Sequence, residues 1–429
     1  MQLYDHQKTI IEEDPIKTLL ALGTGGGKTR LGLELAKKRI LVIVPKQQKL
    51  DETWERNAEK FGIDKDITII SKETFRRDHA KVGYYDTLII DEVHYCLGVY
   101  PDEVQRKGTN IPKTSKLFDA VHWWVHTHKP ERMYLLSATP APKPMNAFAI
   151  SRLLGLKWDF IKFRDRFYRE FTKGYRTIWI QKKDKATTAL LVDIVKSFGY
   201  TGQLSDWFDV PEQTHREIYV GVTPDQKKLI KEITKTEADP MVARAKMRTI
   251  ENGVLYDLGV TELGGKEQQI SRKSIMIKDE KLPHIEELAM EFPKLLIFAA
   301  YTGQVEKMED HLTGLGYNVK TLTGKTKDRG TVIQEADTAD ECIVIAQSSI
   351  SSGYELPTFP CVVFASKSHK LVDYIQGLGR VLRANHIKRN LYVHLITKHN
   401  LFKGKKGSDE SCHEAIMYGE DYQEAVMSQ

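Results

Sequence analysis

The chain has 429 residues, of which 41% are hydrophobic and 28% are charged, and its formal net charge at pH 7 is +6. A chain of this length is longer than most domains with a single hydrophobic core, so more than one domain is expected. The composition is typical of a globular protein, and the positive charge is too small to identify a partner by itself. Because the four cysteines form no Cys-x-x-Cys pair and the longest apolar runs are only strand-sized, we expect no zinc ribbon, disulfide framework or membrane span.

A glycine-rich loop follows the first apolar run of the chain, Thr18–Ala21, and precedes a helix-like pattern at residues 31–38. Glycines let backbone N–H groups surround phosphate oxygens, Lys28 can reach the β- and γ-phosphates, and the Thr29 hydroxyl can bind Mg²⁺. The strict motif has glycine where Leu22 stands. The sequence predicts a site for ATP and Mg²⁺ formed by Gly23, Thr24, Gly25, Gly26, Gly27, Lys28 and Thr29.

Short β-branched or leucine-rich runs alternate with helical patterns along the first part of the chain. These runs lie at residues 19–22, 40–44, 67–70, 87–90 and 133–136. The alternation predicts a parallel sheet with helices on both faces. Asp91 and Glu92 directly follow one of these runs, and in this architecture the carboxyl end of a strand lies beside the phosphate loop. We expect Asp91 to hold magnesium and Glu92 to act on water as the general base.

A second series of strand-like runs lies late in the chain, at residues 294–298, 317–322, 342–346, 361–365 and 391–396. The predicted fold class is therefore α/β, with two similar parallel-sheet lobes at residues 1–144 and 283–429. The segment between them, residues 145–282, is richer in charged and aromatic residues and looks mainly helical. We expect it to form an inserted accessory region.

Two arginines in the second predicted lobe, Arg380 and Arg383, lie one helical turn apart and should face the same way. Departure of the γ-phosphate builds up negative charge, which a pair of guanidinium groups can neutralise. We expect this role for the pair, with Gln376 as a further catalytic residue at motif spacing. If the arginines and Lys28 come from different lobes, ATP binding would close the lobes and hydrolysis would release them.

Four segments in register resemble the motifs of superfamily 2 helicases. Motifs I, II, III and VI are similar to residues 24–29, 91–94, 137–140 and 376–383. Weaker similarities to the adenine-reading glutamine motif and to motifs Ia, IV and V lie at residues 4–7, 44–46, 296–298 and 352–357. The acidic motif reads Asp-Glu-Val-His, and the stretches at 210–212 and 223–226 are similar to the Swi/Snf-like branch. Residues 95–110 match no motif and stay unassigned.

The resemblance implies two RecA-like lobes and further ligand contacts. It implies that Gln7 contacts adenine and that Gly353 and Glu355 contact the ribose, although Gly-Tyr-Glu stands here where many relatives have Gly-x-Asp. It also implies a groove that binds a nucleic-acid strand independently of base sequence. The residues expected to line it are Lys46, Ser71, Lys72, Thr302, Thr323, Lys325 and Ser348.

The implied activity is that of an ATP-dependent DNA helicase or translocase acting on single-stranded, forked or junction DNA. We expect a cytoplasmic protein, with a phage-encoded enzyme in the host cytoplasm as the preferred setting and a monomer as an acceptable state. The alternatives are an RNA helicase, a DNA-translocating protein remodeller that separates no strands, and a non-catalytic ATP-gated binding protein. The Swi/Snf-like stretches argue against the first, and the intact Lys28, Glu92 and arginine pair argue against the last.

Overall fold

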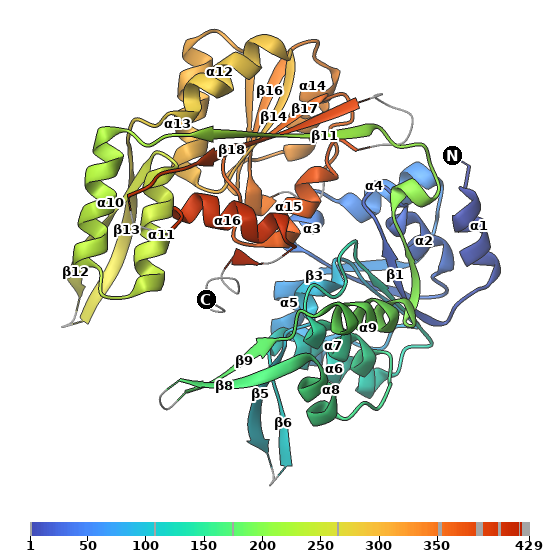
Figure 1. Ribbon diagram of the computed structural model, residues 1–429. Helices are drawn as coiled ribbons and strands as arrows, with labels where there is room; N and C mark the ends of the chain where they lie inside the picture. Colours follow the sequence, from blue (N-terminus) through green and yellow to red (C-terminus); the bar gives the residue numbers. More distant parts are fainter. Residues whose placement is uncertain are drawn as a thin grey trace. The chain divides into compact units, whose positions relative to one another are not determined.

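The computed structural model describes residues 2–106, 109–173, 176–263, 266–350, 354–382, 389–401, 405–419 and 421–422. The chain divides into two compact units, Met1–Phe208 and Asp209–Gln429, which we call unit 1 and unit 2. Each unit contains, among the described residues, a six-stranded sheet whose neighbouring strands all run parallel (Figure 1). The predicted α/β class with two parallel-sheet lobes is confirmed.

The sheet of unit 1 has hydrophobic cores on both faces because alternate residues of its buried strands point to opposite sides. Leu19 and Ala21 belong to one core and Leu20 and Leu22 to the other. The strand order is β10 (Gly199–Gly202), β1 (Lys17–Leu22), β7 (Arg132–Leu136), β4 (Thr87–Ile90), β2 (Ile40–Val44) and β3 (Ile67–Ser71).

Helices cover both faces of this sheet. One core includes side chains of α1 (Asp5–Glu12), α2 (Lys28–Leu35) and α4 (Thr53–Phe61). The other includes side chains of α5 (Lys72–Asp78), α6 (Lys116–His128), α7 (Pro144–Leu153) and α8 (Phe160–Phe167). The remaining helical segments are α3 (Lys46–Leu50), α9 (Lys185–Lys196) and the short 3₁₀ turns at His79–Lys81, Val93–Cys96 and Leu204–Asp206.

Two antiparallel hairpins extend from unit 1, β5 (Val99–Arg106) with β6 (Thr109–Thr114) and β8 (Tyr168–Lys173) with β9 (Arg176–Gln181) (Figure 1). Arg164 of α8 contacts both: it pairs with Glu103 of β5 and lies 3.9 Å from the ring centroid of Trp179 of β9. The segment at 95–110, unassigned in the sequence, thus includes β5 and the start of β6.

The sheet of unit 2 has the order β11 (Glu212–Val220), β18 (Arg389–Thr397), β17 (Cys361–Phe364), β14 (Lys294–Ala299), β16 (Cys342–Gln347) and β15 (Val319–Leu322). Side chains of α12 (Lys281–Glu291) and α13 (Thr302–Gly314) pack in one core, and those of α14 (Arg329–Thr338), α15 (Leu371–Leu378) and α16 (Ser408–Met417) in another. A helix pair, α10 (Pro224–Thr236) and α11 (Pro240–Glu251), precedes the hairpin of β12 (Val254–Leu263) and β13 (Lys266–Met276). A 3₁₀ turn spans Ser348–Ile350.

The segment expected to be an insert, residues 145–282, is divided between the two units. Its β10 pairs with β1 in the sheet of unit 1, and its β11 pairs along nine residues with β18 of unit 2. Residues 163–171, expected to be helical, change from α8 to β8 at Tyr168. Backbone pairing decides these positions, with distant strands for β10 and β11 and with the next strand, β9, for β8. None of the described helices is long and apolar enough to cross a bilayer.

Candidate active site

The glycine-rich loop connects β1 to α2 in unit 1. Gly25 and Gly27 have left-handed backbone angles, with φ of +84° and +77°. The Gly26 N–H donates to the Gly23 carbonyl oxygen at 3.0 Å, which closes a tight turn before the helix. The turn leads into the N-terminus of α2, and the first N–H groups of an α-helix, which have no acceptor within the helix, favour anions.

A buried glutamine lies against this loop. Gln7 of α1 is 1% exposed, and its Oε1 accepts a hydrogen bond from the Tyr4 N–H at 3.0 Å. A Cβ atom at residue 27 would lie 2.0 Å from Gln7 Nε2, so any side chain at this position would require the Gln7 amide to move. The structure therefore brings together two residues that the sequence predicted as ATP ligands, Gln7 and Gly27.

Substitution of Gly27 by alanine should destabilise unit 1 through two separate effects. The left-handed backbone costs roughly 1–2 kcal/mol for a residue with a Cβ, and the overlap with Gln7 adds to that. Gly62→Ala is the matched control, because Gly62 has φ of +66° but no atom within 4 Å of the added Cβ. Urea unfolding of both variants separates the effects. Gln7→Ala combined with Gly27→Ala should recover the difference, and equal losses in the two single variants would show that Gln7 moves aside at no cost.

The Lys28 ammonium group lies over the backbone of the loop. Its Nζ donates to the carbonyl oxygens of Leu22 at 2.7 Å and Gly23 at 3.1 Å. Lys28 is the first residue of α2, so its charge sits where the helix N-terminus also favours anions. The arrangement places a cation and a set of backbone donors around the same loop.

Asp91 follows β4 and is 6% exposed. Its Oδ2 accepts from Trp54 Nε1 at 3.1 Å, and its Oδ1 accepts from the Glu92 N–H at 2.9 Å. Burial, followed by the nearby Glu92 carboxylate, raises the pKa of Asp91, while the Trp54 hydrogen bond and the Lys28 charge act in the opposite direction. The influence of Lys28 shows that the predicted phosphate lysine and the predicted magnesium ligand lie within electrostatic range.

Glu92 lies beside His94, which in turn contacts Ser137 at the end of a neighbouring strand. The backbone of Glu92 is left-handed, with φ of +47°, a conformation that is rare for residues with a side chain. Its Oε2 lies 3.4 Å from His94 Nδ1, and the same nitrogen lies 2.9 Å from the Ser137 Oγ. Ser137 is fully buried at the end of β7, and its Oγ accepts from the Thr139 N–H at 3.1 Å.

Sheet order explains this contact. Because β7 lies between β1 and β4, the motif after β7 stands between the phosphate loop and the acidic pair. His94 and Ser137 were recognised in the sequence as members of motifs but were given no role. The resemblance to motif III was the signal that could have found them.

An aromatic cluster beside the loop was not predicted. The ring of His6 stacks on that of Trp207, with centroids 4.0 Å apart and planes inclined by 13°. His6 Nε2 also lies 3.2 Å from the Gly26 carbonyl oxygen. Trp207 comes from the end of unit 1, and a Cβ at Gly202 would lie 2.4 Å from its ring. Sequence reasoning missed this cluster because its members are about two hundred positions apart in the chain.

Unit 2 carries the other residues predicted for the ATP site. Gln376 is 3% exposed and Arg380 is 6% exposed. Arg380 Nε donates to the Gln376 carbonyl oxygen at 2.8 Å, and its Nη1 donates to the Tyr354 carbonyl oxygen. Arg380 is thus held inside unit 2 by backbone groups, whereas Glu355 is exposed. Gly353 and Arg383 lie outside the described residues.

The residues predicted to bind a strand fall into two groups. Lys46, the first residue of α3, and Lys325 are exposed, while Thr302, at the start of α13, and Thr323 are partly exposed. The two lysines are open to a ligand, whereas the hydroxyls of Thr302 and Thr323 already take part in hydrogen bonds within the protein.

The other three are buried. Ser71 caps α5 by accepting from the Thr74 N–H at 3.2 Å. Lys72 is 6% exposed, and its Nζ lies 3.7 Å from the centroid of the Tyr95 ring, which differs from the solvent-facing position expected for a phosphate contact. Burial also lowers the pKa of Lys72. Ser348 is 5% exposed.

Part of unit 2 matches a known protein family. Residues 278–385 match the helicase conserved C-terminal domain. The ATP-dependent RNA helicase DBP3 of Yarrowia lipolytica is 23% identical over 178 residues, which are 41% of this chain and only 31% of that protein's length. The helicase domain of Pyrococcus furiosus Hef aligns with 96% of this chain and 98% of its own, at a TM-score of 0.47 and 13% identity. Within unit 2, residues 278–385 are therefore similar to the helicase conserved C-terminal domain.

Proposed function

We propose that this chain is an ATP-dependent DNA helicase or translocase of superfamily 2. The observation that carries the proposal is the loop of unit 1, where Lys28 Nζ lies on the loop carbonyls and within electrostatic range of the buried Asp91. Enzymes that hydrolyse nucleoside triphosphates use a phosphate-binding loop together with an acidic pair of this kind. The helicase C-terminal domain in unit 2 supports nucleic acid as the partner.

The oxygen atoms of Asp91 and Thr29 are suitable ligands for magnesium. Each Asp91 oxygen accepts one hydrogen bond from the protein and retains a second lone pair, and the Thr29 hydroxyl is a further oxygen donor. Oxygen donors of this kind are what Mg²⁺ takes in nucleotide-hydrolysing enzymes. In this proposal Thr29 and Asp91 hold the ion, which when bound neutralises phosphate charge.

The remaining roles follow from charge and position. Lys28 and the loop N–H groups bind the phosphates, and Gln7 contacts the adenine. Glu92 takes the proton of the attacking water, and its carboxylate lies 3.4 Å from His94 Nδ1. Arg380 and Arg383 stabilise the charge that develops on the γ-phosphate. Since Arg380 is bound to two carbonyl groups of unit 2, its substitution should also disturb the fold locally.

The experiment that tests this function is ATP hydrolysis by the full chain with a panel of strands. We expect single-stranded DNA to stimulate hydrolysis, and forked and four-way DNA to be acted on in preference to plain duplex. Strand-displacement and triplex-displacement assays then separate unwinding from translocation. Absence of hydrolysis with every strand would refute the proposal.

An RNA helicase is the second candidate, because the Yarrowia lipolytica relative is named as one. This similarity, at 23% identity over 41% of the chain, does not decide between RNA and DNA. Stimulation by an RNA of the same base sequence, with none by DNA, would decide for the RNA helicase.

Strand binding should weaken steeply with salt, because phosphate contacts release counterions with a slope of about −0.7 per contact on a single strand. Lys46 and Lys325, both exposed, are the expected contacts. Alanine at either position should make the slope shallower by about 0.7, in anisotropy titrations over a range of salt. Lys227→Ala, an equally exposed lysine on α10, is the control and should leave the slope unchanged. Slopes equal to that of the unmodified chain in both variants would remove these lysines from the groove.

A further inference from the structure

Unit 2 contains a pocket of about 440 Å³ beside the carboxyl ends of its central strands. Tyr301, which follows β14, and Ser348, which follows β16, form one part of its lining, and His369 follows β17. Helix α11 contributes Arg244 and Arg248. Ligands of open α/β sheets bind at the carboxyl ends of the strands, and this volume lies within the range of small-ligand sites.

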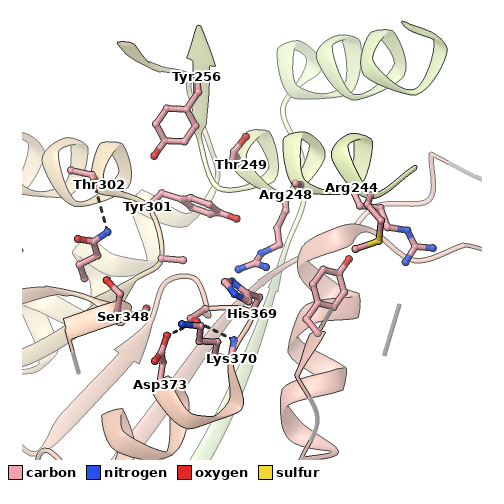
Figure 2. Close-up of a pocket in the computed structure, with 17 residues that line it drawn as sticks. Arg244, Arg248, Thr249, Tyr256, Tyr301, Thr302, Ser348, His369, Lys370 and Asp373 are labelled. Carbon is pink, nitrogen blue, oxygen red and sulfur yellow. Dashed lines mark hydrogen bonds between the residues drawn. The ribbon is translucent and has the colours of Figure 1, made fainter. Parts of the chain in front are cut away.

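Arg248 is the most unusual member of the lining. It is only 6% exposed, and its Nε has no hydrogen-bond partner among the residues that the structure describes. Its Nη2 donates to the Lys367 carbonyl oxygen, and its guanidinium carbon lies 5.7 Å from the Tyr301 ring centroid. Figure 2 shows the side chain extending from α11 toward His369. A buried donor left without an acceptor is costly, so the site gains from an acceptor supplied by a ligand.

A second buried cation in the same unit shows what Arg248 lacks. Lys281 is 1% exposed and its Nζ donates to Asp409 Oδ2 at 2.8 Å, to Asn252 Oδ1 at 2.7 Å and to the Ala365 carbonyl at 2.7 Å. Its charge and all three of its donors are satisfied within the protein. Arg248 forms no ion pair of this kind with any described residue.

The other polar groups of the pocket also favour an anion. The buried Ser348 Oγ likewise has no hydrogen-bond partner among the described side chains and backbone groups. Arg244 is partly exposed and Lys370 is exposed, and both carry positive charge into the lining. The one carboxyl group in the lining, that of Asp373, accepts from the Ser368 hydroxyl at 2.6 Å, and its burial raises its pKa. Positive groups therefore outnumber the single carboxylate.

We propose that this pocket, the Arg248 pocket, binds a phosphate group of a nucleic-acid strand, with the Arg248 guanidinium and the Ser348 hydroxyl as donors and Arg244 at its edge. The inference rests on the proposed function and assigns α11, which no predicted motif includes, to strand binding. A strand is favoured over a free nucleotide because Thr302 and Ser348, both expected from the sequence to contact a strand, line the pocket. The Tyr301 ring offers a surface on which the attached sugar or base can pack.

The test is anisotropy of fluorescein-labelled oligothymidylate and oligouridylate, titrated with the full chain without ATP. Arg244→Ala and Arg248→Lys should each weaken binding about tenfold, the usual effect of losing a hydrogen bond to a charged group. Arg244→Ala should also make the salt slope shallower by about 0.7. Lys246→Ala removes the same charge from the same helix, at a residue outside the lining that pairs with Glu237, and should bind like the unmodified chain.

Thermal unfolding shows which variants are folded. If Arg248→Lys does not fold, Arg244→Ala still tests the proposal, because Arg244 is only partly buried. Wild-type affinity in folded Arg244→Ala, with strand-stimulated ATPase intact, overturns the pocket and leaves the proposed function standing. Thymidine monophosphate is the probe for a free nucleotide. If it binds and its binding alone is lost in the variants, the strand assignment is wrong. No strand binding and no stimulation in the unmodified chain would overturn both inferences.

Discussion

Replacement of Glu92 by glutamine should slow ATP turnover at least about a hundredfold, a typical loss for a general base, while ATP still binds. Glutamine keeps the size of the side chain but cannot take a proton from water. Phosphate binding depends on Lys28 and the loop, which the substitution leaves in place. Phosphate release measured at saturating ATP and strand gives the turnover, and binding of a fluorescent ATP analogue gives the affinity.

Glu131→Gln is the matched control for this experiment. Glu131 is an exposed carboxylate of unit 1 that pairs with Lys38 at 2.8 Å. The substitution therefore removes one negative charge, as Glu92→Gln does, at a residue that belongs to none of the predicted motifs. Turnover in this variant should equal that of the unmodified chain. Near-normal turnover in Glu92→Gln would instead transfer the role of general base to another residue.

Replacement of Lys28 by alanine should reduce both ATP affinity and turnover. Loss of a hydrogen bond to a charged group is worth about 1.5–3 kcal/mol, so the dissociation constant for ATP should rise about 10- to 100-fold. Lys28→Arg keeps the charge but presents a planar fork in place of a compact ammonium group, and it should restore affinity only in part. Equilibrium binding of the fluorescent analogue measures both changes.

Lys37→Ala serves as the comparison, because Lys37 is an exposed lysine just past the end of α2 whose partner is Asp14 at 2.7 Å. Its affinity for ATP should be unchanged. If Lys28→Ala bound ATP as tightly as Lys37→Ala, the loop would not be the phosphate site, and the proposed function would lose its main support.

The strands could be predicted from sequence because strands of a parallel sheet are buried on both faces. The run Ile40–Val44 is fully buried and coincides with β2, and the run at 87–90 coincides with β4. The phosphate loop could be predicted because its function demands particular residues at fixed spacing. The helix after it begins at Lys28 and ends at Leu35, earlier than the apolar pattern indicated, because the glycine turn itself starts the helix.

Other features depend on contacts between distant residues. The burial of Lys72 under Tyr95, the anchoring of Arg380 by Tyr354 and the contact of His94 with Ser137 each require knowledge of which segments are neighbours in the fold. A motif identifies the residue type at a site, but its exposure is set by the packing around it.

The strand β10 gives the phosphate loop a mechanical connection to the chain that leads out of unit 1. The Gly23 N–H donates to the Gly202 carbonyl oxygen at 2.8 Å, and β10 is hydrogen-bonded to β1 up to that point. Six residues later the chain passes Phe208, the last residue of unit 1. A nucleotide that orders the phosphate loop would therefore also order the end of β10, the strand from which the chain leaves unit 1.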